Sequence, residues 1–257
     1  MKLVAWFGEV DKDDVGLVGG KGANLGELTK AGIPVPSGFI LTSHAYFHFL
    51  HEAGLKSKIQ DLLADLDVNE SRRLQRAAND IKQMIMDARM PNGVAADIAR
   101  AYREMGAGPV AVRSSATAED LAEASFAGQQ STFLNVEGEA EVVSAVQDCW
   151  ASLFEARAIF YRQQAGFDHL KVGIAVVVQH MVQSQRSGVM FTIEPVTGDR
   201  SKIVIEAIYG LGEAIVSGAL TPDLYVVDKA ALSIIEKTVA RQERQMVRNP
   251  EAATGQG

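Results

Sequence analysis

The sequence has few of the features that mark secreted, membrane-spanning or nucleic-acid-binding proteins. Its 257 residues include one cysteine, Cys149, so no internal disulfide can form and a reducing cytoplasm is expected. No apolar run approaches the ~20 residues needed to span a bilayer. The N-terminal stretch MKLVAWFGEVDKDD turns acidic too soon for a signal peptide. The formal net charge of −7 argues against broad binding to nucleic acids or anionic membranes.

What is present is the composition of a protein with a sizeable core. Hydrophobic residues make up 47% and charged residues 22% of the chain. Apolar residues recur at three- and four-residue spacing from about residue 56 to 105, which predicts helices broken at Pro91-Asn92-Gly93. After residue 108 strands and helices mix. We therefore predict an α+β protein with a mostly helical subdomain, 1–108, that carries a glycine-rich phosphate loop, and an α+β subdomain, 109–257.

Several elements can be placed from local patterns. Residues 174–178 are continuously apolar, which indicates a strand over 174–179 that is covered on both faces. We expect further helices over 24–31, 43–51, 139–150 and 153–164. The other expected strands cover 3–7, 109–113, 132–136, 187–192, 202–207, 224–227 and 234–239.

A glycine-rich stretch near the N-terminus is the first candidate site. Residues 18–28 read VGGKGANLGEL, with Lys21 between two glycines. Glycines let the backbone approach a ligand closely, and the start of a helix presents N–H groups beside the Lys21 ammonium. The spacing is not that of the G-x-x-x-x-G-K-[ST] phosphate loop, and glycine-rich turns before helices are common. By itself the stretch is therefore a weak indication of phosphate binding.

The most informative stretch, residues 111–135, reads AVRSSATAEDLAEASFAGQQSTFLN. An apolar strand ends in Arg113 and is followed by hydroxyl residues, two acids and a loop of small residues around Gly128. A guanidinium at the end of a buried strand needs an anionic partner, and its donors match phosphate oxygens. A salt bridge to Glu119 or Asp120 is the structural alternative. Combined with the glycine-rich stretch, the pattern favours phosphate.

Two later stretches follow strands. Gln179, Met181 and Val182 come at the end of the apolar run, where backbone groups can meet the edge of an adenine and apolar side chains its face. Composition alone favours an ordinary strand end. Glu213, in the sequence GLGE, follows another strand and can approach a ribose hydroxyl.

Metal ligands cannot be assigned from the sequence. Glu194 and Glu206 end or interrupt strands, but single carboxylates in such places are usually solvated or paired with Lys and Arg. The five histidines show no metal-ligand spacing with cysteines or acids.

Together the motifs resemble the N-terminal nucleotide-binding domain of the phosphoenolpyruvate synthase and pyruvate phosphate dikinase family. Five segments carry the resemblance: LVGGKGANLGELTKAGIPVPSGF, VAVRSSATAEDLAEASFAGQQSTFLNV, CWASLFEARAIFYR, SGVMFTIEPVTG and GLGEAIVSGALTPD. Together they span about residues 15–228, and the second is highly specific. They are similar most of all to phosphoenolpyruvate synthase, although rifampicin phosphotransferases share nearly all of them and remain an alternative.

The resemblance implies an ATP-grasp fold in which ATP lies between two lobes. By analogy with the family, Lys21 and Arg113 would hold the phosphates during catalysis, and Gly128 would belong to the loop that closes over them. The remaining contacts to the pocket, the adenine and the ribose would come from Thr132, Phe133, Gln179, Met181, Val182 and Glu213.

The resemblance also implies a reaction. The β-phosphoryl group of ATP would pass to a histidine on a separate domain and then to pyruvate, with Mg²⁺ as cofactor, in pyruvate metabolism and gluconeogenesis. The family's phosphohistidine signature, its pyruvate-binding barrel and the closing strands of the ATP-grasp domain do not occur in this sequence. We therefore expect an ATP-grasp domain truncated on its C-terminal side that does not complete the reaction alone. A non-catalytic nucleotide-binding module is the alternative from another class.

Overall fold

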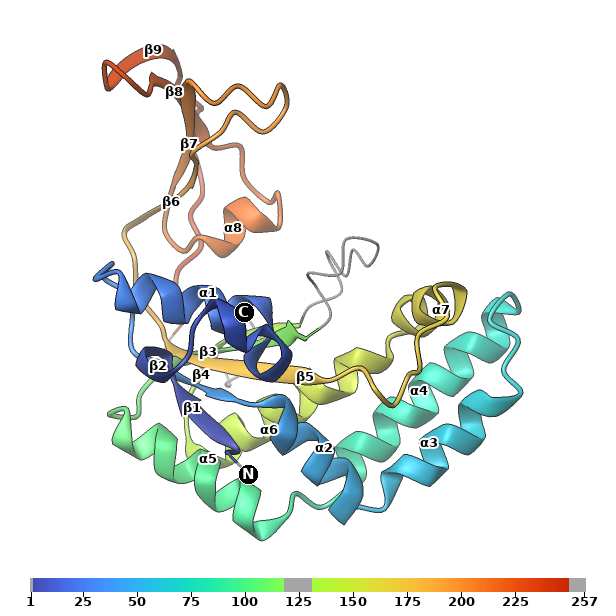
Figure 1. Cartoon of the computed structure of the whole chain (residues 1–257). Coiled ribbons are helices and arrows are strands. Elements are labelled where there is room, and N and C mark those ends of the chain that lie inside the picture. The colour runs from blue at the N-terminus through green and yellow to red at the C-terminus, as the bar shows by residue number, and fades with distance from the viewer. Residues whose placement is uncertain (1, 118–130, 250–257) are drawn as a thin grey trace. The chain divides into compact units, whose positions relative to one another are not determined.

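The computed structural model describes residues 2–117 and 131–249, and it is a mixture of helices and antiparallel strands, as predicted (Figure 1). Gly128 lies outside the described residues. The chain forms two compact units that divide between Met181 and Val182. The division predicted from the sequence lay near residue 108. Strands from both sides of that point pair in one sheet, which holds them in the same unit.

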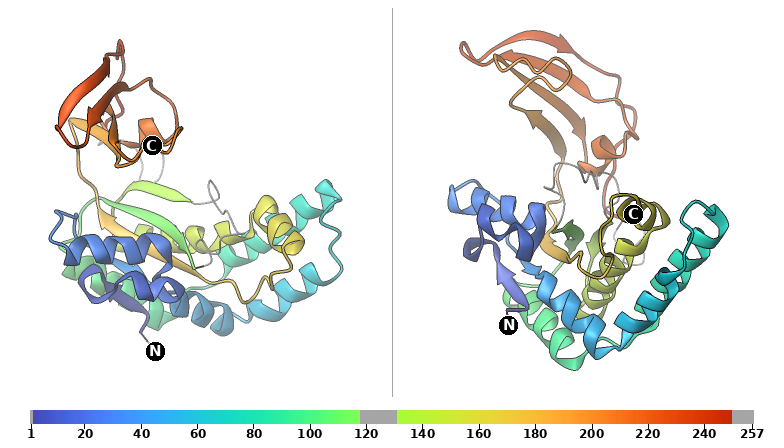
Figure 2. Two further views of the ribbon diagram at one scale, coloured as in Figure 1. Left: turned by 45° about the horizontal axis from the view of Figure 1, so that its top comes forward. Right: turned by 45° about the vertical axis from the view of Figure 1, so that its right-hand side comes forward.

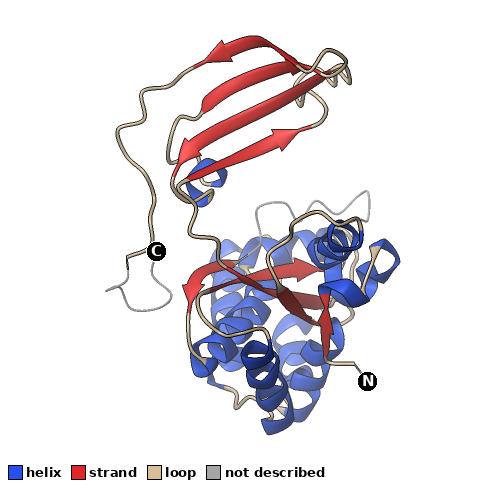
Figure 3. Ribbon diagram, turned by 90° about the vertical axis from the view of Figure 1, so that its left-hand side faces the viewer, coloured by secondary structure: helices blue, strands red, loops and turns tan. Residues whose placement is uncertain are grey.

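A five-stranded antiparallel sheet forms the centre of the first unit (Figure 3). The strand β5 (Ile174–His180) is its middle strand, and every residue from Ile174 to Gln179 is buried, as the apolar run predicted. The full order is β1 (Val4–Trp6), β2 (Gly38–Leu41), β5, β3 (Val110–Ala116) and β4 (Thr132–Val136).

Alternating residues of β5 contribute to two different cores, because successive side chains of a strand point to opposite faces. Val176 and Val178 belong to a large core with the helices of one face, whereas Ala175 and Val177 pack with residues of α1 (Val15–Lys30) on the other. Figure 2 shows the helices around the sheet. The other helices are α2 (Ser43–Glu52), α3 (Leu55–Ala64), α4 (Ser71–Asp87), α5 (Asn92–Glu104), α6 (Glu139–Ala151) and α7 (Ala156–Gln164).

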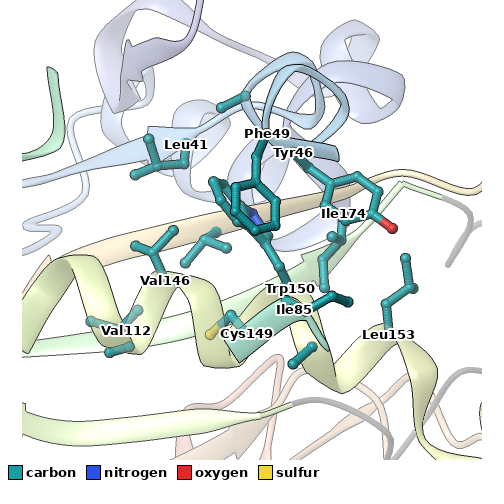
Figure 4. Close-up of a cluster of buried hydrophobic side chains, with 14 of the residues drawn as sticks. Leu41, Tyr46, Phe49, Ile85, Val112, Val146, Cys149, Trp150, Leu153 and Ile174 are labelled. Carbon is teal, nitrogen blue, oxygen red and sulfur yellow. The ribbon is translucent and has the colours of Figure 1, made fainter. Parts of the chain in front are cut away.

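Aromatic side chains fill the middle of the larger core (Figure 4). The ring centroids of Phe49 and Trp150 lie 4.9 Å apart, and those of Tyr46 and Trp150 lie 6.2 Å apart. Cys149 is buried beside them and unpaired. Burial raises the pKa of its thiol far above the usual range, so this cysteine is a core residue, as the sequence indicated.

Two local predictions about helices were wrong in their bounds. The first helix was expected over 24–31 and instead begins at Val15, while its end before Gly32 agrees with the prediction. The helical run after residue 55 is broken at Pro91, as predicted, but also over residues 65–70. Short 3₁₀ helices cover Phe7–Glu9, Lys12–Asp14 and Ser152–Phe154.

The second unit is built on a four-stranded antiparallel sheet with β9 and β6 at its edges. All four strands lie where the sequence predicted them, within two residues. Every residue of β9 is exposed, so this strand contributes little to a core. The elements are β6 (Arg186–Phe191), β7 (Lys202–Tyr209), α8 (Glu213–Val216), β8 (Asp223–Asp228) and β9 (Ser233–Thr238). In the described parts of both units, no helix is long and apolar enough to cross a membrane.

Candidate functional site

The register of the central sheet brings several predicted site residues to one face. Arg113 on β3 lies directly opposite Thr132 on β4 and Val177 on β5. Gln179 lies opposite Ala111, two residues before Arg113 on the same strand. Because residues opposite one another share a face, Arg113, Thr132 and Gln179 lie on the side of Val177, which α1 covers.

Lys21 reaches the same strand from α1. Its Nζ atom donates to the carbonyl oxygen of Ser114 at 2.8 Å, so the ammonium lies against the residue that follows Arg113. The two cationic residues are 92 positions apart in the sequence, yet they meet at one short stretch of β3. Arg113 is part of that strand, and Lys21 is hydrogen-bonded to the residue after it. A shared anionic ligand is the chemistry that such a pair suits.

Phe133 differs from its neighbour Thr132 in the direction of its side chain. It lies opposite Val112, and its side chain packs against the larger core on the face away from α1. On the α1 face, Phe133 can therefore offer backbone groups only.

The end of β5 is held from both sides. Gln179 Nε2 donates to the carbonyl oxygen of Pro36 at 3.1 Å, and the N–H of Met181 donates to the carbonyl oxygen of Pro109 at 3.0 Å. His180 Nε2 lies 2.7 Å from the carbonyl oxygen of Ala107, which can only accept, so this nitrogen carries the proton. The segment predicted to meet the adenine thus starts from a fixed strand end.

Val182 and Glu213 belong to the second unit. The Val182 side chain is 59% exposed. Glu213 is half-buried and is the first residue of α8, where a negative charge interacts favourably with the helix N-terminus. This position gives Glu213 a local structural role besides the predicted one at a ribose.

Glu194 is engaged in a turn. Its carboxylate accepts from the hydroxyl and the N–H of Thr197 and from the N–H of Val196 at 3.1 Å, and these bonds lower its pKa. In residues 2–117 and 131–249, no group of three or more His, Cys, Asp or Glu side chains is arranged to hold a metal ion.

The decisive observation is a family match over nearly the whole chain. The family described as "Pyruvate phosphate dikinase, AMP/ATP-binding domain" matches residues 15–256. The chain belongs to this family.

Curated relatives agree with this assignment. Proteins named "Probable phosphoenolpyruvate synthase" from Methanothermobacter thermautotrophicus and Methanocaldococcus jannaschii are 52% and 48% identical over 96% and 99% of this chain. "Phosphoenolpyruvate synthase" from Pyrococcus furiosus is 46% identical over 99%. The chain spans 37%, 22% and 36% of the lengths of these three relatives, respectively.

The structure of this dikinase-type nucleotide-binding domain adds two residues that sequence reasoning left without a role. The backbone carbonyl of Ser114 binds Lys21, and the hydroxyl of Ser115 contacts the backbone of α1 on both sides of Gly19. Both serines stand in the predicted phosphate motif as small hydroxyl residues. Their partners lie more than 90 residues away, so no local pattern identifies those contacts.

Proposed function

We propose that this chain is the ATP-binding part of a phosphoenolpyruvate synthase, with an ATP-grasp-like fold. The observation that carries the proposal is the attachment of Lys21 and Arg113 to one stretch of β3, on the sheet face that also holds Thr132 and Gln179. The names of the relatives support the synthase among the family's activities.

In the proposed reaction, ATP, pyruvate and water give phosphoenolpyruvate, AMP and phosphate. The β-phosphoryl group passes to a histidine on a domain outside this chain and from there to the enolate oxygen of pyruvate, while water takes the γ-phosphoryl group. Phosphoryl transfer depends mainly on positioning and charge neutralisation. Lys21 and Arg113 would supply both by holding the phosphate oxygens through charge-assisted hydrogen bonds.

The other assignments complete this proposal. Gly128 would belong to the loop over the phosphates, with Thr132 and the backbone of Phe133 beside it. Gln179, Met181 and Val182 would receive the adenine, and Glu213 the ribose. Mg²⁺ would accompany the ATP phosphates, and we assign none of its ligands to the described residues. The enzyme would work in the cytoplasm, in pyruvate metabolism and gluconeogenesis.

Calorimetric titration with ATP and Mg²⁺ tests the site. Replacing Lys21 or Arg113 by Ala removes a charge-assisted phosphate contact and should weaken binding by about 1.5–3 kcal/mol each. Lys56→Ala, on the exposed face of α3, is the matched control and should bind as the wild type does. Unchanged affinity in both site variants would defeat the assignment.

A further inference from the structure

The helix α1 is broken at Gly19. Gly19 has φ 68° and ψ 169°, far from helical values, and the helix resumes with Gly20 and Lys21. A restarted helix has N–H groups in its first turn without acceptors inside the helix. An ordinary helix start satisfies one of them with the side chain of its N-cap residue, but Gly19 has no side chain.

Ser115 of β3 supplies the missing group from another element. Its hydroxyl donates to the carbonyl oxygen of Val18 at 3.0 Å and accepts from the N–H of Gly22 at 3.4 Å. The side chain is fully buried. One hydroxyl thus connects the last turn before the break with the first turn after it.

The approach of Ser115 to the break is close. A Cβ atom on Gly19 would lie 2.2 Å from Ser115 Oγ and 2.4 Å from the Ser115 carbonyl oxygen. The positive φ of Gly19 independently disfavours any other residue. The break and Ser115 therefore require each other: glycine provides the space, and the hydroxyl provides the cap.

Lys21 lies inside the segment that this cap holds. The N–H of Gly22, the next residue, binds Ser115, and the ammonium of Lys21 binds the carbonyl oxygen of the adjacent Ser114. We infer that Ser115 is a positioning residue for the phosphate-binding lysine, acting through the backbone of α1 without touching the nucleotide. This inference rests on the proposed ATP site.

The test compares ATP with adenosine, which lacks the phosphates. Ser115→Ala should weaken ATP binding about tenfold, the size of a typical lost cap, and leave adenosine affinity unchanged. Ser152→Ala is the matched control: Ser152 is a buried serine whose hydroxyl donates to one carbonyl, that of Cys149, at 2.7 Å. A merely structural effect would lower stability in both variants without separating ATP from adenosine.

A second pair of variants approaches the contact from the other side. Gly19→Ala places a methyl group against Ser115 and should also weaken the binding of ATP but not that of adenosine. Gly16→Ala, on the same helix with nothing within 4 Å of the new methyl group, should not. If a variant fails to fold, amide exchange in the wild type decides: the Gly22 N–H must exchange slowly, and rapid exchange overturns the cap.

The outcomes separate the two proposals. A wild-type chain that binds no ATP contradicts the proposed function and this inference with it. A wild type that binds ATP, with Lys21→Ala weakened but Ser115→Ala unchanged, contradicts the positioning role alone.

Discussion

The Nε atom of the buried Arg162 donates to Nδ1 of His169 at 3.1 Å. A guanidinium can only donate, so His169 Nδ1 must be the unprotonated nitrogen. The proton is therefore on Nε2, which lies 3.1 Å from Oε1 of Gln163. Burial and then the charge of Arg162 lower the pKa of His169 to about 4.

This pairing predicts a loss of stability on mild acidification. The ordinary histidine pKa is 6.5, so below that pH His169 is protonated in the unfolded chain. In the folded chain it stays neutral until about pH 4. The free energy of unfolding should fall by at most about 3 kcal/mol from pH 6.5 to 4 through this group, then stop falling. Urea denaturation at several pH values measures it. His169→Gln should reduce the dependence of the free energy of unfolding on pH, whereas His44→Gln, at an exposed position, should leave it unchanged. The same pH dependence in both variants would contradict the assignment.

Replacing Arg162 should reveal how costly its buried charge is. Its Nη1 and Nη2 atoms have no hydrogen-bond partner in the described part of the chain, and burial lowers its pKa to about 10. Arg162→Met keeps the volume against the Phe154 ring, and we expect stability unchanged or raised by about 1–2 kcal/mol. Arg162→Ala leaves a cavity and should lose about 2–4 kcal/mol. Urea denaturation of both variants tests this, and a Met variant as unstable as the Ala variant would mean that the charge itself is needed.

Two glycines of α1 should respond in opposite directions to the same substitution. A Cβ atom on Gly26 would lie 2.3 Å from the carbonyl oxygen of Val10, so Gly26→Ala should cost about 2–3 kcal/mol by forcing the backbone apart. Gly16→Ala meets open space and should stabilise the helix by up to about 1 kcal/mol. Thermal unfolding of the two variants provides the comparison, and a tolerated Gly26→Ala would argue against this close approach of backbones.

Gln147 closes the C-terminal end of α4. Its Nε2 atom lies 2.5, 3.1 and 2.8 Å from the carbonyl oxygens of Ile85, Met86 and Ala88 and donates its two hydrogens to these three acceptors, so one hydrogen is shared between two of them. Gln147→Leu leaves these acceptors unpaired and should cost about 1–3 kcal/mol. Gln147→Glu places a carboxylate against them and should cost more at pH 7 than near pH 4, where protonation restores a donor. Chemical denaturation measures these losses, and Gln75→Leu, on the exposed face of α4, is the control. A glutamate variant as stable as wild type at pH 7 would count against the cap.

Local patterns were sufficient where a segment's neighbours along the chain decide its conformation. The β-branched run of β5 identified a strand covered on both faces, and β4 has the predicted bounds, Thr132–Val136. The helical run is interrupted before Pro91, which is the N-cap residue of α5, because a proline in the middle of a helix would remove a hydrogen bond and clash with the preceding turn. The motifs also indicated the family to which the chain belongs.

The course of α1 was beyond local reasoning. Its glycines have poor helix propensity, so the sequence predicted a helix only after the last of the close-set glycines. The helix begins at Val15 because distant groups stabilise it: Ser115 caps the break, and the hydroxyl of Ser43 donates to the Gly16 carbonyl oxygen at 3.1 Å. Such contacts override intrinsic propensity.

The amino-acid sequence alone determined the α+β class, the positions of most elements, and the residue types of a phosphate-binding motif. Tertiary structure decided which residues meet: that Lys21 lies against Ser114, that Phe133 faces the core, and that the chain divides after Met181. The physical reason is that hydrophobic periodicity and turn chemistry act over a few residues. Strand register and close backbone contacts depend instead on partners more than 90 positions away, as in the bond between Lys21 and Ser114.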